Sequence, residues 1–138
     1  NGYYGAAGEH ILAYIDLLLD KVEQEDIHMH LYTNPAQGYL PDEIMDQAEA
    51  LFDAAEAAVA SDAELLERVR VARMPLVYAK SFPRNGCQIE EGRLRFLGPL
   101  AGAEEIQDFV ARMKRHGFRT VRERGGDPAQ WALLGWMC

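Results

Sequence analysis

The sequence predicts a mostly α-helical protein, an antiparallel three-helix bundle followed by a small helix-strand-helix unit. Three long segments repeat their apolar residues at spacings of three and four, as helices with one buried face do. Capping and turn residues separate these segments. The chain of 138 residues is long enough to bury a real core. We expect the bundle over residues 1–81, an irregular connection or weak hairpin over 82–102, and the helix-strand-helix unit, packed on the bundle, over 103–138.

The first predicted helix runs from Glu9 to Val22. Its apolar line recurs at i, i+4, i+7 and i+11, and two leucines flank it: Ile11, Ile15, Leu18 and Val22, with Leu12 and Leu19. Asp16, Asp20 and Glu23 fall elsewhere on the helix. The pattern predicts one wide apolar face turned toward the rest of the bundle.

The second predicted helix opens at Pro41, a residue favoured in the first helical turn. Asp42 and Glu43 follow it, where the N-terminus of a helix favours negative charge. Its predicted core line is Ile44, Ala48, Leu51, Ala55, Ala58 and Val59. Because alanine is small and the best helix former, we expect a neighbouring helix to approach this face closely.

The third predicted helix starts after almost no loop. Ser61-Asp62-Ala63-Glu64 has the pattern of a capping box, in which Ser61 and Glu64 satisfy each other's free backbone N–H groups. The apolar face that follows is Leu65, Val69, Ala72, Leu76 and Ala79. Pro75 predicts a kink, because it removes one hydrogen bond of the helix.

The remaining third of the chain has weaker signals. Turn dipeptides at Asn85-Gly86 and Glu91-Gly92 favour a small hairpin of Gln88–Glu90 with Arg93–Leu97. Helical spacing then returns from Ala103 to His116 and stops at Gly117. A short strand-like stretch, 118–122, precedes a last helix that Asp127-Pro128 would begin.

Charge and composition exclude several classes of protein. Asp and Glu outnumber Lys and Arg by 22 to 14, giving a net charge of −8, so we expect neither nucleic acid nor a membrane surface as a partner. The cysteines Cys87 and Cys138 fit neither a disulfide scaffold, a zinc site nor a redox motif. The glycine-rich segments at Gly5–Gly8 and Gly125-Gly126 lack the context of a phosphate loop. We therefore expect no cofactor.

The sharpest local pattern is an alternation between Ile27 and Tyr32. In an extended segment it would place His28, His30 and Tyr32 on one side and the apolar residues between them on the other. Three interpretations are open: a metal site, a polar edge that faces a ligand, or a connection whose polar side meets water and neighbouring helices. A metal site needs three or four ligands, and the spacing supplies no third metal-binding residue. The substrate-binding candidates are His28, His30 and Tyr32.

Carboxylates are numerous but do not form a catalytic pair in the sequence. Glu90-Glu91 and Glu104-Glu105 are adjacent in the chain and occupy turn or first-turn positions. Glycoside hydrolysis requires two carboxyl groups that face each other at about 5–9.5 Å. We expect these residues to be solvated and the chain to contain no catalytic residue.

Several segments together resemble a known bacterial family. They are Tyr3–Gly8, the following Ile11–Leu18, His28–Tyr32 and the Ala/Glu-rich helix Asp46–Ala60. The family consists of large uncharacterised proteins classified under a domain of unknown function, with a hexosaminidase-like or α-glucuronidase-like glycoside hydrolase barrel upstream. The resemblance is best over residues 1–80.

This resemblance implies that the chain is the helical region that follows the barrel. The chain also begins without Met and runs straight into a helix, which we interpret as a piece of a larger protein. The implied function is a non-catalytic accessory domain of a carbohydrate-active enzyme, with the upstream barrel as its partner and carbohydrate as a further one. The alternative is a helical interaction or oligomerisation module with no carbohydrate role.

Overall fold

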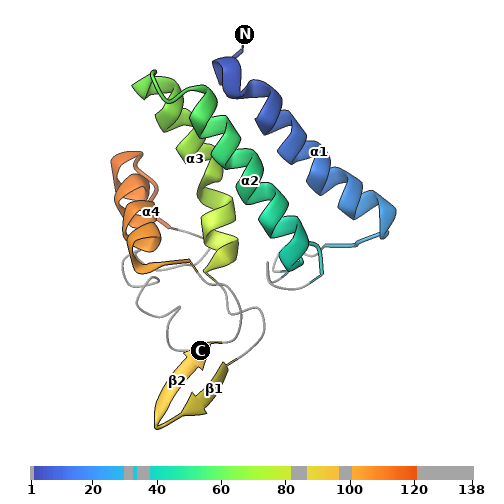
Figure 1. Cartoon of the computed structure of the whole chain (residues 1–138), viewed down its shortest axis with the longest axis vertical. Helices are drawn as coiled ribbons and strands as arrows, with labels where there is room; N and C mark the ends of the chain where they lie inside the picture. Colours follow the sequence, from blue (N-terminus) through green and yellow to red (C-terminus); the bar gives the residue numbers. More distant parts are fainter. Residues whose placement is uncertain (1, 30–32, 34–37, 82–86, 97–100, 121–138) are drawn as a thin grey trace. The chain divides into compact units, whose positions relative to one another are not determined.

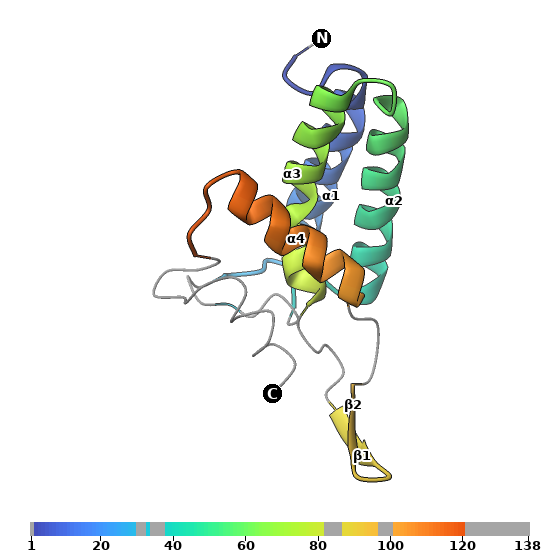
Figure 2. The same cartoon turned by 90° about the vertical axis from the view of Figure 1, so that its left-hand side faces the viewer.

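A computed structural model of the protein describes residues 2–29, 33, 38–81, 87–96 and 101–120. The chain is mostly helical, which confirms the predicted fold class. It divides into two compact units, Asn1–Ala79 and Lys80–Cys138. The first unit holds a short 3-10 helix, η1 (Gly5–Ala7), and the helices α1 (Gly8–Gln24), α2 (Asp42–Ala58) and α3 (Ala63–Lys80). Successive helices run antiparallel in a bundle-like arrangement (Figures 1 and 2).

The buried line of α2 lies one residue away from the predicted one. Met45, Ala48, Phe52, Ala55 and Val59 are buried, whereas Ile44 and Leu51 are half-buried and Ala58 is exposed. The prediction was therefore wrong at Ala58 and only partly right at Leu51, whereas Ile44 packs against the core from its half-buried position. The physical reason is the rotation of the helix that buries Met45 and Phe52, because a phenyl ring removes far more apolar surface from water than the alanine at position 58.

The closest helix packing is between α1 and α2. Cα atoms of the two helices come within 8 Å of each other, which the fully buried Ala48 and Ala55 allow. The ring centroids of Tyr14 and Phe52 lie 4.8 Å apart across this contact. The small residues of α2 thus bring α1 close, as the alanine content predicted for a neighbouring helix.

Only part of the predicted apolar face of α1 is buried. Ile11 is buried, and Tyr14, Leu17 and Leu18 pack against the core. In contrast, Leu12, Ile15 and Leu19 have exposed fractions of 61%, 44% and 53%. The expectation of one wide face turned inward was wrong for these three side chains. A helix of this kind has apolar residues over a wider arc than one neighbouring helix covers.

The helix α3 begins one residue later than its predicted capping box. Asp62 is its N-cap, and its Oδ1 atom accepts hydrogen bonds from the backbone N–H groups of Glu64 and Leu65, both at 3.0 Å. The side chain of Glu64 binds Arg68 instead of reaching back to the cap. The prediction of Ser61 as the cap was wrong, because a carboxylate is the stronger acceptor for two N–H groups at the positive end of a helix. The helix continues through Pro75.

The segment before α1 is held against α3. Gly5 has a φ of +54°, which favours glycine, and a Cβ there would lie 2.7 Å from a methyl carbon of Leu65, which would have to move. The guanidinium of Arg68 lies 4.4 Å from the centroid of the Tyr3 ring. It also donates a hydrogen bond of 2.8 Å to the carbonyl oxygen of Tyr3. The Tyr-Gly junction therefore has a structural role, which is to join η1 to α3.

The second unit contains a hairpin and one described helix. Strands β1 (Cys87–Glu90) and β2 (Arg93–Phe96) pair antiparallel, with Glu90 opposite Arg93. Glu91 and Gly92 both have positive φ, 51° and 73°, as in the two-residue turn that the sequence predicted. The hairpin is confirmed at the predicted place.

The helix α4 (Ala103–Arg115) matches the predicted helical segment closely. Ile106, Phe109 and Met113 are buried, and the Glu105 carboxylate accepts a hydrogen bond of 3.3 Å from the Gly102 backbone N–H. After Gly117, residues 118–120 form no strand, so the predicted strand was wrong over this part. The rest of that stretch and the predicted last helix lie outside the described residues.

The close contact of α1 with α2 yields a prediction about Ala55. Replacing Ala55 with Leu should lower the free energy of unfolding by about 1–3 kcal/mol, because added methylene groups overpack a tight helix contact. The matched control is Ala58→Leu, on the exposed side of the same helix, which should change it by less than about 0.5 kcal/mol. Urea denaturation followed by circular dichroism measures both. Equal effects at the two positions would show that α1 does not pack on Ala55.

The position of the cap yields a second prediction. Asp62→Ala should destabilise the protein by about 1 kcal/mol, because two N–H groups at the start of α3 lose their acceptor. Ser61→Ala should have a clearly smaller effect. The same denaturation measurement compares the two variants. A larger loss of stability in Ser61→Ala would support the predicted capping box at Ser61 instead.

Candidate functional site

The segment after α1 carries the substrate-binding candidates. The chain leaves the helix through Asp26, at a φ of 49°, and the Ile27 backbone N–H donates to the carbonyl oxygen of Val22 at 3.0 Å. The His28 side chain is 86% exposed, and its Nε2 atom lies 3.5 Å from Oδ1 of Asp26. Asp26 is a neighbour that the alternation pattern did not include.

The structure places only one of the three candidates. His30 and Tyr32 lie outside the described residues. Met29, expected on the side opposite His28, is also exposed, so this stretch does not separate a buried apolar side from a polar one. His28 can donate or accept a hydrogen bond from this exposed position. Its role in binding stays a prediction.

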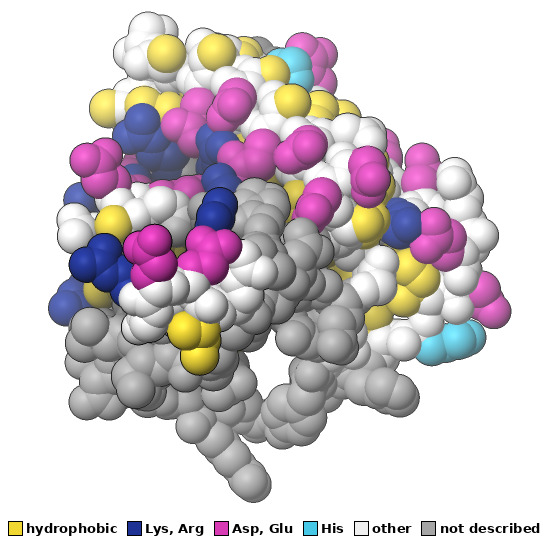
Figure 3. Space-filling model, turned by 60° about the horizontal axis from the view of Figure 1, so that its bottom comes forward, with side chains coloured by type: hydrophobic (Ala, Val, Ile, Leu, Met, Phe, Trp, Pro, Cys, Tyr) yellow, Lys and Arg dark blue, Asp and Glu magenta, His cyan; other side chains and the backbone are white. Residues whose placement is uncertain are grey.

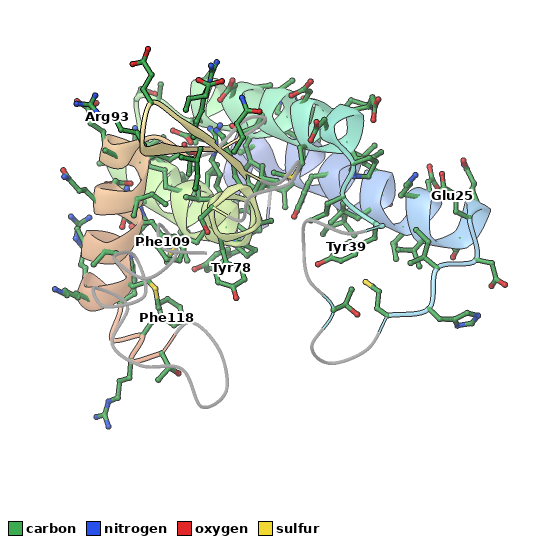
Figure 4. All side chains as sticks on the ribbon, turned by 90° about the horizontal axis from the view of Figure 1, so that it is seen from below. Glu25, Tyr39, Tyr78, Arg93, Phe109 and Phe118 are labelled. Carbon is green, nitrogen blue, oxygen red and sulfur yellow. The ribbon has the colours of Figure 1, made fainter. Side chains whose placement is uncertain are left out.

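Two tyrosines that alternation could not predict lie near the same end of the bundle. Figure 4, which views the molecule from below, shows Tyr39 and Tyr78 at this end, as separate side chains from different elements. Tyr39 precedes α2 and packs against the core, and Tyr78 belongs to α3 and is half-buried. Each has an aromatic ring that can pack on a sugar ring and a hydroxyl group that can bind sugar hydroxyls.

Tyr14 lies deeper in the same region. Burial raises the pKa of its phenol above the ordinary value of 10.0, and the nearby Tyr39 raises it further. The ring of Tyr14 packs on Phe52. Tyr14 is thus a neutral, mainly structural group at neutral pH.

Several carboxylates of the second unit have basic partners. Glu90 accepts a hydrogen bond of 2.9 Å from Arg95, and Glu105 accepts one of 3.2 Å from Lys80. The polar side of the hairpin, lined by Glu90, Glu91, Arg93 and Arg95, forms an open hollow, and Figure 4 shows Arg93 pointing outward. These contacts neutralise charge at the surface. They do not aim two carboxyl groups at one bond.

Metal binding was another of the three interpretations of the histidines. Among the described residues, no group of three His, Cys, Asp or Glu side chains is placed to hold a metal ion. Within the described ranges, the carboxylate near His28 is that of Asp26. In the part of the chain that the structure describes, no helix has the length and apolarity needed to cross a membrane.

The most distinctive surface of the described chain is on α1. Leu12, Ile15 and Leu19 form an exposed row at i, i+3 and i+7, which we call the α1 stripe. Beside it runs a second row of exposed side chains, the acidic row: Glu9, Asp16, Asp20 and Glu23. Figure 3 shows hydrophobic side chains exposed among acidic ones over the described part of one face. The sequence signal for this surface was the wide apolar face of the first predicted helix, but we predicted that whole face to lie in the core.

A scan of protein-family models and searches of curated proteins and of solved structures found no match to this chain.

The raised pKa of Tyr14 leads to a prediction for alkaline solution. The pKa of the Tyr14 phenol is higher in the folded protein than in the unfolded chain. The stabilisation that the neutral phenol contributes is therefore fully present below about pH 10 and is lost as the pH rises through the folded pKa. The midpoint of urea denaturation should therefore fall above about pH 10. Tyr14→Phe should reduce this fall, whereas the control Tyr3→Phe, at a residue that is 64% exposed, should not. Identical pH profiles for the two variants would contradict the assignment.

Proposed function

We propose that this chain is a non-catalytic helical accessory domain of a carbohydrate-active enzyme, and that it docks on the rest of that protein through α1. The observation that carries the docking role is the α1 stripe. Leaving large aliphatic side chains in water forgoes about 25 cal/mol for each Å² of apolar surface that a partner would cover. A row of three such residues on one helix is typical of a surface that packs against another element.

The carbohydrate part of the proposal is supported by the resemblance of Tyr3–Gly8 and the later segments to the family with an upstream barrel. Side chains at the end of the bundle where α1 finishes are compatible with it. His28, Tyr39 and Tyr78 supply both donors and acceptors, which sugar hydroxyls require. In this proposal the barrel holds the catalytic acids, and the present chain contributes at most side chains at the rim of the cleft.

The second candidate is a helical interaction module without a carbohydrate role. The α1 stripe favours it equally, because an apolar row says nothing about the substrate of the partner. The two candidates differ in what they do to sugar binding, so an experiment on the complete parent protein separates them.

For docking, the test is association of this chain with the separately produced region that precedes it in the parent. Isothermal titration calorimetry should detect binding, and Ile15→Gln should weaken it by about tenfold or more, as expected for a central apolar contact. The control is Ile89→Gln, an exposed isoleucine on the hairpin, which should bind like the unchanged chain. Equal affinities for the two variants would remove α1 from the interface.

For carbohydrate binding, the test uses the complete parent. His28→Ala should raise the KM for a glycoside substrate severalfold with little change in melting temperature, because an exposed imidazole stabilises the fold little. His116→Ala, at another exposed histidine, serves as the control, and alanine at His30 and Tyr32 extends the series. The chain alone should show no turnover of aryl glycosides. Unchanged KM values in all three variants would favour the interaction module.

A further inference from the structure

We infer that the partner element of the α1 stripe is an amphipathic helix whose apolar row is bordered by Lys or Arg. This inference rests on the proposed docking role of α1 and names the chemistry of the surface that meets it. Its first ground is the shape of the stripe. Leu12 and Leu19, the ends of the row, are seven positions apart, which is roughly two helical turns at about 1.5 Å per residue. Spacings of three and four on one narrow row are those of the seam between two packed helices.

The second ground is the order of side chains around α1. At 100° per residue, the core-facing residues Ile11, Tyr14 and Leu18 come first, followed by the α1 stripe and then by the acidic row. The acidic row therefore borders the stripe on the side away from the bundle core. In helix pairs, charged residues in this flanking position face the flanks of the partner helix and decide which partner fits.

The third ground is that the acidic row has little internal compensation. Asp16, Asp20 and Glu23 have no ion-pair partner among the described residues. Lys21, the basic residue of α1, lies on the opposite side of the helix and pairs with Glu25. The carboxylates are thus available to a partner, and bringing them beside further carboxylates would be unfavourable.

The same charges argue against two other occupants. In a symmetric antiparallel pair of α1 helices, the acidic row of one copy would face that of the other, so like charges would meet across the seam. A membrane surface that carries anionic lipid would also repel this row, whereas helices that lie on such membranes are rich in Lys and Arg. A basic-edged helix is the occupant that satisfies both the apolar stripe and the acidic row.

The experiment uses two synthetic helical peptides of about 20 residues with the same leucine row. One has Lys on the flanking positions and the other has Glu there. Fluorescence anisotropy with the complete chain should show the Lys peptide binding at least about tenfold more tightly at low salt, with the difference shrinking as salt rises. In Asp16→Asn/Asp20→Asn/Glu23→Gln the difference between the peptides should largely disappear. Asp46→Asn, at an exposed acid of α2, should leave it unchanged.

A second variant separates the stripe from the charges. Ile15→Gln should weaken binding of both peptides, and circular dichroism checks that it folds. Equal binding of the two peptides by the unchanged chain would overturn the inference, as would concentration-dependent dimerisation in sedimentation runs that Ile15→Gln abolishes. Binding to vesicles of anionic lipid would overturn it as well. If the preceding region of the parent binds through Ile15 while neither peptide does, the docking role stands and the helical, basic partner is wrong.

Discussion

The guanidinium of Arg73 holds the second and third helices of the bundle together. It donates hydrogen bonds to Asp53 at 2.8 Å and to Glu56 at 3.0 Å, and it also binds Glu49. The Arg73 side chain is only 17% exposed. Burial alone would lower its pKa, but the hydrogen bonds to the carboxylates outweigh that effect and raise it. A charge taken this far out of water requires such partners, so the network constrains how α3 can lie on α2.

Phe52 connects this network to the other side of α2. Its ring is 4.8 Å from that of Tyr14 on α1 and 6.0 Å from the guanidinium carbon of Arg73 on α3. One fully buried aromatic ring thus lies next to side chains of both neighbouring helices. The alanines of α2 allow close approach on the α1 side, whereas long side chains bridge to α3. The bundle depends on α2 having these two different faces.

Much of the fold was predictable because its signals are local. The helix ends follow from Pro41, Asp42 and Gly117, and the hairpin follows from Glu91-Gly92. The buried line of α2 was not predictable in this way. The predicted and the observed lines share Ala48, Ala55 and Val59 and differ only by a small rotation of the helix. Side-chain volume decides between them, and periodicity does not measure volume. The cap at Asp62 failed for a similar reason, since two adjacent residues both fit the pattern.

The ion pairs between α2 and α3 had a signal in the sequence, but the basic residues of α3 were explained there by the helix dipole alone. Glu49, Asp53 and Glu56 recur at i, i+4 and i+7 on α2, and Arg70 and Arg73 face them from α3. Basic residues late in a helix also suit its C-terminal dipole, and that explanation alone left their partners unidentified. For the candidate site, the sequence located His28 at the end of α1, but the exposure of Met29 depends on the path of the chain, which alternation does not determine.

The two sides of α1 show how a helical bundle can carry an exposed apolar row next to its buried face. Ile11 is buried and Leu18 packs against the core. A rotation of α1 that buried the exposed leucines next to them would expose Ile11 and Leu18. The adjoining acidic row adds repulsion between copies of the same helix while leaving the apolar row accessible to a helix of opposite charge. In the docking role that we propose, a single surface would therefore combine the attraction that docking needs with the repulsion that makes it selective.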